Sequence, residues 1–224
     1  MPHSSSGLHV HTVSLDGAHH VCAIWKTRRD RAAGHDCAFS GAWLLPRQGP
    51  EQDWAVEIAL DGLRAGGLRD GPACVSLGIT SDGPRLFGVR SGVCESDLPT
   101  LTREATGEGQ WECAADARTD PRRFHGKAPE GYRLLRHAAC VIVDAQPGLS
   151  VGGQPLGDWI AELPSYRAAP LGQGGHGSPG RQENAPLRVH LLHQRQSVVL
   201  RDYVAARLLG DASGQGPARQ PRER

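Results

Sequence analysis

The sequence has few apolar residues and no long apolar run. Apolar residues make up 38% of the 224-residue chain, below the usual range for globular domains. No stretch approaches the roughly 18 consecutive apolar residues of a membrane-spanning helix. The polar residues 2–7 that follow Met1 exclude an apolar secretory segment at that position. We therefore expect a soluble, cytoplasmic protein with no membrane segment.

Lysine is almost missing, and neither sign of charge dominates. Only Lys26 and Lys127 are lysines, so arginine supplies nearly all of the positive charge, as is typical of a GC-rich coding sequence. The formal net charge of +1 gives no general attraction to nucleic acid or to an anionic membrane. The composition therefore carries no strong signal for a nucleic-acid partner.

The sequence also contains no C-x-x-C pair, which argues against a zinc knuckle or a dithiol redox motif. Its six cysteines are widely spread, and an even count permits three disulfides. Because no secretory segment is visible, we expect a reducing compartment in which the cysteines act mostly as small hydrophobic residues. They are Cys22, Cys37, Cys74, Cys94, Cys113 and Cys140.

Residues 50–68 are the clearest predicted helix. Pro50 lies near its start, acidic residues occupy the first turn, an apolar stripe follows, and Gly66 marks the end. Strands over residues 73–80 and 85–90 follow at once. With a hairpin predicted over residues 8–25, this order predicts an α+β fold: a mainly antiparallel sheet packed by a few short helices, with many loops.

The rest of the chain gives shorter signals. Glycine, with 29 residues, and proline, with 16, favour short elements and long loops. The further predicted elements are strands at 37–45, 138–143 and 187–192, helices at 97–105, 156–163 and 197–209, and a loop at 119–129.

These elements suggest a main α+β domain over residues 1–167. A Gly/Pro-rich loop or linker covers 168–186 and separates this domain from a C-terminal strand and helix at 187–210, which we expect to pack on the main domain. A disordered tail is expected over 211–224.

The densest group of candidate metal ligands lies near the start of the chain. On a strand, His9 and His11 project from the same face, about 6 to 7 Å apart, which permits both to bind one metal ion. The alternative is that they are ordinary strand residues in a chain with 11 histidines.

Residues 8–12, Leu-His-Val-His-Thr, followed by Asp16-Gly17, resemble the first motif of the PHP (polymerase and histidinol phosphatase) family of metal-dependent phosphoesterases. The resemblance implies that His9 and His11 bind metal, with Asp16 in a supporting position. Gly7 and Leu15 depart from the motif. Residues 92–95 resemble the family's glutamate-bearing strand, which makes Glu95 a further candidate ligand.

The resemblance also implies a cofactor and a reaction. A divalent ion of manganese, zinc or iron would activate water for hydrolysis of a phosphate ester. A later histidine, His125 or His190, would complete the ligand set.

Two functions follow from the sequence. Because the catalytic set is incomplete, the leading prediction is a nonenzymatic accessory, regulatory or inhibitor-type binding protein with no cofactor. In that case Trp111 and Trp159 would contact a protein partner; the alternative is that both are core residues. The alternative is a metal-dependent, phosphoesterase-like hydrolase that uses His9 and His11.

Overall fold

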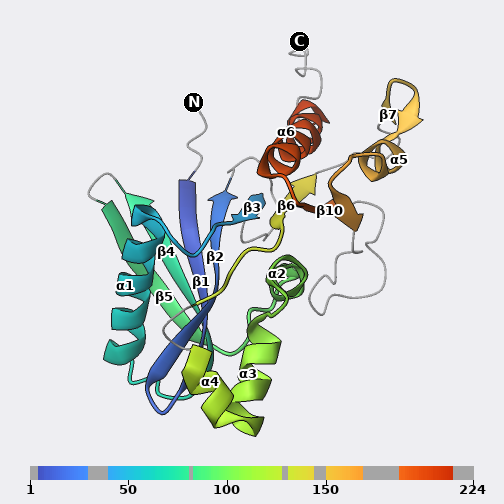
Figure 1. Cartoon of the computed structure of the whole chain (residues 1–224). Coiled ribbons are helices and arrows are strands. Elements are labelled where there is room, and N and C mark those ends of the chain that lie inside the picture. The colour runs from blue at the N-terminus through green and yellow to red at the C-terminus, as the bar shows by residue number, and fades with distance from the viewer. Residues whose placement is uncertain are drawn as a thin grey trace, which may run out of the picture.

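The computed structural model describes residues 5–29, 40–80, 83–127, 131–143, 150–168 and 187–213. Their strands form an eight-stranded sheet in the order β5-β4-β1-β2-β3-β6-β10-β9, and a separate ribbon pairs β7 with β8. All paired strands are antiparallel. The helices pack around this twisted sheet (Figure 1). The predicted α+β fold with a mainly antiparallel sheet is confirmed.

The first half of the sheet, made of β5, β4, β1 and β2, is built on a long hairpin. Strands β1 (Ser5–Leu15) and β2 (Ala18–Arg29) pair along their lengths. Asp16 and Gly17 form the turn with positive φ angles of 55° and 85°, a conformation that glycine and aspartate tolerate better than other residues. The predicted hairpin is confirmed, and its strands are longer than the apolar pattern indicated.

Helix α1 (Pro50–Ala65) covers one face of this half, beside strands β4 (Gly71–Thr80) and β5 (Gly83–Ser91). It begins at Pro50 and ends near Gly66, as its sequence predicted. Its buried stripe of Ala55, Ala59 and Leu63 packs on alternate residues of β1, β2 and β4, including Leu8 and Val75. This alternation leaves the other residues of these strands facing away from α1.

The second half of the sheet contains β3 (Gly41–Leu44), β6 (His137–Val143), β10 (Leu187–His193) and β9 (Tyr166–Ala168). The C-terminal helix α6 (Gln196–Ser213) packs on β6 and β10. Helix α2 (Leu98–Thr106) packs on the opposite face of β6, against Ala138 and Cys140. The predicted strands at 138–143 and 187–192 and the predicted helices at 97–105 and 197–209 are therefore confirmed.

Two helices were not foreseen. Helix α3 (Gln110–Thr119) lies in a region that gave no clear signal, and α4 (Pro121–Lys127) replaces the loop predicted at 119–129. Both have short apolar faces, with Cys113, Ala117 and Phe124 as their buried residues against the end of the hairpin. Lys127 pairs with Glu108 and Asp116. Packing and these ion pairs, rather than an apolar period, specify the two helices.

A small unit near α6 contains β7 (Ser150–Val151), β8 (Gln154–Pro155) and α5 (Leu156–Ala161). Trp159 is partly buried in the core beneath α6, whereas Trp111 on α3 is 62% exposed. The linker predicted at 168–186 begins at Ala168, the last residue of β9, and the tail predicted at 211–224 begins inside α6, which continues to Ser213. The remaining residues of both segments lie outside the described residues, as does Cys37. In the described part of the chain, no helix combines the length and apolar character needed to cross a membrane.

Candidate functional site

The first candidate site lies on the sheet face opposite α1. Because Leu8 and Val10 of β1 pack toward α1, His9 and His11 project from the other face. His11 is fully buried, and neither of its ring nitrogens has a hydrogen-bond partner of acceptable geometry among the described residues. A buried polar group without a partner destabilises the folded state by about 1–3 kcal/mol. This imidazole is therefore a natural candidate for a ligand.

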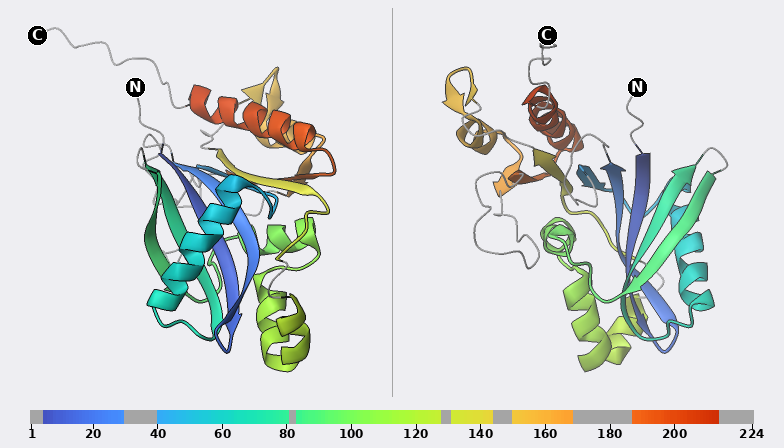
Figure 2. Two further views of the ribbon diagram at one scale, coloured as in Figure 1. Left: turned by 60° about the vertical axis from the view of Figure 1, so that its left-hand side comes forward. Right: turned by 180° about the vertical axis from the view of Figure 1, so that it is seen from behind.

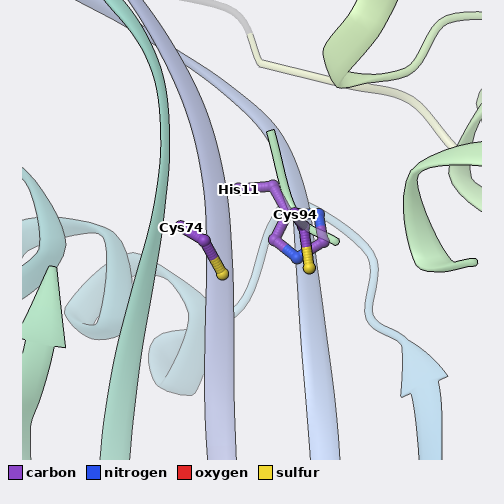
Figure 3. Close-up of side chains that lie close together, drawn as sticks. All are labelled: His11, Cys74 and Cys94. Atoms are coloured by element: carbon purple, nitrogen blue, oxygen red, sulfur yellow. The ribbon is translucent and has the colours of Figure 1, made fainter. Parts of the chain in front are cut away.

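Two cysteine thiols surround the His11 ring. Cys74 is the residue of β4 directly opposite His11 in the ladder, and Cys94 follows β5 in the chain. One ring nitrogen of His11 and the two sulfur atoms all lie within 4.8 Å of one another. Figure 3 shows the three side chains gathered on one side of the strands. These three residues are called the His11 cluster below.

Polar contacts hold Cys94 in this position. Its backbone N–H donates to Oε1 of the buried Gln110 at 2.9 Å, and its Sγ lies 3.2 Å from the Ser96 hydroxyl. Gln110 also donates from Nε2 to the carbonyl oxygens of Thr12 and Ala73. One amide side chain therefore ties the Cys94 loop to both strands of the cluster.

The two thiols of the His11 cluster differ in acidity. The hydrogen bond from Cys74 lowers the pKa of Cys94 to about 3, against the opposing effect of burial, and the nearby His11 ring adds to this lowering. The same thiol pair raises the pKa of Cys74 above its ordinary value, because its proton is held between the two sulfurs, and burial raises it further. The cluster therefore favours the thiolate form of Cys94, and thiolates are the metal-binding and nucleophilic form of cysteine.

A second group of the same composition lies closer to the turn of the hairpin, where His20 pairs with Val13. His20, Cys22 and Cys113 are all buried, and their ligand atoms lie within 4.8 Å of one another. Nδ1 of His20 is 3.1 Å from the carbonyl oxygen of Lys127. The hydrogen bond from Cys22 lowers the pKa of Cys113 to about 6. These residues are called the His20 cluster.

The predicted metal ligands are only partly brought together. His9 Nδ1 lies 4.0 Å from Cys74 Sγ, beside the cluster that contains His11. Asp16 is in the exposed hairpin turn, where its backbone N–H donates to Asp70. Glu95 is 83% exposed and pairs with Arg90. The metal role of these residues stays a prediction, and no carboxylate belongs to either cluster.

The later histidines proposed to complete the set are held elsewhere. His125 on α4 lies 3.8 Å from Asp16, and His190 on β10 lies 3.6 Å from Asp97. The thiols that do approach His11 were interpreted from the sequence as small hydrophobic residues. Cys74 and Cys94 are twenty positions apart, and only the pairing of β4 with β1 brings Cys74 opposite His11.

A second, more open surface lies on the same sheet face, along β5. Leu86 and Val89 face α1, because they are the side chains nearest to Gly62 of that helix. A register shift in the β4–β5 ladder leaves Phe87 unpaired and turned to the other face, where its ring lies over Gly78. Phe87 is 73% exposed. In the right view of Figure 2, β4 and β5 lie in front of α1, on the side away from that helix.

Two arginines flank Phe87 on this face. Arg85 pairs with Gly78 in the ladder and Arg90 pairs with Cys74, so both belong to the face opposite α1. Gly88 lies between them, and a Cβ placed there would meet no atom within 4 Å. Arg85, Phe87, Gly88 and Arg90 therefore form an exposed strip, in which the backbone at Gly88 is not covered by other atoms. We call this strip the β5 surface.

No protein-family model matches the sequence, and no curated protein matches it. Solved structures do match the fold. An L-amino acid ligase from Bacillus licheniformis superimposes with a TM-score of 0.65 at 17% identity, over 92% of this chain and 52% of the ligase. The chain therefore shares its fold with about half of that ligase.

Further ligases give the same result. N5-carboxyaminoimidazole synthase from Aspergillus clavatus, solved with ADP and 5-aminoimidazole ribonucleotide, matches with a TM-score of 0.61 and 13% identity, over 92% of this chain and 51% of that one. Phosphoribosylglycinamide synthetase from Anaerococcus prevotii matches with a TM-score of 0.56 and 8% identity, over 90% and 51%. The chain spans about half of the length of each of these proteins.

These matches correct both functional predictions. The leading prediction of a nonenzymatic accessory, regulatory or inhibitor-type protein is wrong, and so is the alternative of a phosphoesterase-like hydrolase, because the fold is shared with solved ligase and synthase structures. The motif that suggested the hydrolase lies on β1, a strand with two antiparallel neighbours. A short histidine motif fits such a strand as well as it fits a barrel strand, because both have a side-chain period of two.

Proposed function

We propose that this chain is the nucleotide-binding part of an ATP-dependent ligase-type protein. The observation that carries the proposal is the match over about nine-tenths of the chain to ligases, among them structures solved with ADP or ATP. The chain spans about half of each such protein, so the proposal is limited to nucleotide binding.

The β5 surface is the proposed place for the nucleotide. An exposed aromatic ring binds a nucleobase by stacking, which contributes about 1–3 kcal/mol per base in other proteins. Phe87 has this exposure, and its ring packs on the backbone of Gly78. The adenine base would therefore lie against Phe87.

The phosphates would lie toward the arginines. Guanidinium groups bind phosphate oxygens through two parallel hydrogen bonds. Arg90 is 52% exposed, and its partner Glu95 is 83% exposed. A pair this exposed is weak, so a phosphate group can replace the carboxylate at little cost. Arg85 lies on the same face at the other end of the strip.

Magnesium usually accompanies nucleotide phosphates and is bound by one or two carboxylates together with the phosphate oxygens. The ten described strands contain no aspartate or glutamate at all. The residues of the sheet therefore do not fit a magnesium site, and we derive no phosphoryl-transfer step from them.

The test is a calorimetric titration of the purified chain with ADP and with ATP, each in the presence of magnesium and of EDTA. Phe87→Ala should weaken ADP binding by about 5- to 150-fold, the equivalent of one stacked base. Trp111→Ala is the matched control, because Trp111 is also a highly exposed aromatic residue but lies on α3. Arg90→Ala should weaken ADP more than adenosine.

Two results would overturn the proposal. The first is an absence of measurable ADP and ATP binding at millimolar concentration in both buffers. The second is equal binding by the Phe87 and Trp111 variants, which would place the nucleotide away from the β5 surface. Far-ultraviolet circular dichroism of each variant confirms that the fold is kept.

A further inference from the structure

The His11 cluster has the features of a metal site. Its three side chains come from β1, β4 and the segment after β5, so the site is assembled by tertiary structure. The ligand atoms of a tetrahedral zinc ion lie about 3.5 Å apart, given metal–ligand bonds of about 2.0–2.3 Å. The separations in the cluster, all within 4.8 Å, are close enough to contract around one ion.

The environment of His11 supports a ligand role independently. The imidazole is fully buried, and apart from its interaction with the Cys94 thiol, neither nitrogen has a hydrogen bond of acceptable geometry among the described residues. Buried histidines in a packed core normally donate or accept at least one hydrogen bond. Coordination to an ion between the two thiols would give one nitrogen a well-oriented partner.

The supporting contacts resemble those of established metal sites. Side chains that bind metal are usually oriented by hydrogen bonds from a surrounding shell of residues. Here Gln110 fixes the backbone of Cys94, and the Ser96 hydroxyl contacts the Cys94 sulfur. The cluster is therefore held in position before any ion arrives.

We propose that His11, Cys74 and Cys94 bind a zinc-class ion, with three protein ligands and one open coordination position. Thiolate and imidazole ligands select zinc or copper(I) over magnesium or manganese. The ion would join β1, β4 and the Cys94 loop. This site does not depend on nucleotide binding at the β5 surface.

The experiment uses cobalt(II) as a spectroscopic substitute for zinc. The full chain, purified without a histidine tag, is reduced and stripped of metal with a chelator. The Cys113→Ser background removes a thiol from the His20 cluster, so that the His11 cluster is measured by itself. Cobalt should bind at one equivalent with thiolate charge-transfer absorption, and zinc should displace it.

Ligand variants then locate the ion. In the same background, Cys94→Ser and His11→Ala should each lower the affinity for cobalt at least tenfold and reduce or shift the absorption. Cys140→Ser is the matched control: it removes another buried cysteine, on β6, outside both clusters. It should bind cobalt as the background does. Ser96→Ala, which keeps all three ligands, should retain the stoichiometry and bind more weakly.

Three outcomes would overturn the proposal. One is the absence of thiolate absorption from a reduced, folded chain, and another is unchanged binding in the Cys94 variant. The third is recovery of the untreated protein with Cys74 and Cys94 joined as a disulfide, seen as two missing thiols, with no cobalt binding after reduction. If Cys94→Ser does not fold, the comparison between Ser96→Ala and Cys140→Ser decides: equal affinities would contradict the site.

Discussion

Cys74 lies directly opposite His11 in the antiparallel ladder of β1 and β4. Side chains of directly paired residues on one face lie about 4.5–5.5 Å apart at Cβ, so the thiol and the imidazole share one small, buried space. Cys94 closes this space from the segment that follows β5. The pairing makes the stability of this region sensitive to what the space contains.

Replacing His11 by leucine should therefore remove the stabilisation that zinc gives, while costing no stability in the absence of metal. In chelator, His11→Leu should leave the free energy of unfolding unchanged or raise it by about 1–3 kcal/mol, because a buried imidazole without partners is removed. With zinc at 100 times its dissociation constant, the wild type alone should gain about 2.7 kcal/mol. Urea unfolding in the two buffers measures both values, and equal zinc responses of wild type and variant would contradict the prediction.

Gln110 should be one of the more sensitive polar residues. Gln110→Leu leaves the Cys94 amide and two strand carbonyl oxygens without their partner, so we expect a loss of about 2–4 kcal/mol. Gln154→Ala is the control, because its side chain makes an exposed hydrogen bond to Glu162, and it should cost less than about 0.5 kcal/mol. Chemical denaturation of both variants provides the measurement. Equal losses of unfolding free energy would show that the hydrogen bonds of Gln110 do not stabilise the fold.

Gly41 should not tolerate a side chain. A Cβ at this position would lie 2.0 Å from the Tyr203 hydroxyl oxygen, so Gly41→Ala must displace Tyr203 and with it the contact between β3 and α6. We expect a loss of about 1–3 kcal/mol, as for other overpacked sites. Gly126→Ala on α4 meets no atom within 4 Å and should be neutral or stabilising by up to about 1 kcal/mol. Thermal unfolding of the pair checks both, and a neutral Gly41→Ala would refute the prediction.

Asp97 should make part of the stability depend on pH. The His190 imidazole, 3.6 Å away, and the Arg188 guanidinium, 3.3 Å away, hold the pKa of Asp97 below its usual range, although burial opposes this. A depressed carboxyl pKa adds stability that is present above the unfolded pKa of about 3.9 and is lost as the pH falls through the folded value.

The corresponding test compares the wild type with Asp97→Asn between neutral and acid pH. The variant should be less stable at pH 7, and the difference should shrink as the pH falls below about 4. Asp61→Asn is the control, because Asp61 is 69% exposed in its pair with Arg64, and it should change stability little at either pH. A difference for Asp97→Asn that stays constant across this range would contradict the prediction.

The sequence predicted those elements that local patterns specify. The helix at α1 has a proline start, an apolar stripe and a glycine end within its own residues, and the β4–β5 hairpin has turn chemistry between two apolar strands. Helices α3 and α4 have no such pattern. They depend on Gln110, Lys127 and a few small buried residues, and the value of each contact is set by distant strands.

The residues of the His11 cluster also differ in whether the sequence could indicate them. The alternation of β1 alone indicates that His9 and His11 share a face, because the side-chain period of a strand is two. Which residues meet His11 was decided only by tertiary structure: the register of β4 against β1 brings in Cys74, and the path of the chain after β5 brings in Cys94. Strand register and chain path depend on the whole core, so no local pattern could show that cysteines, rather than carboxylates, surround this histidine.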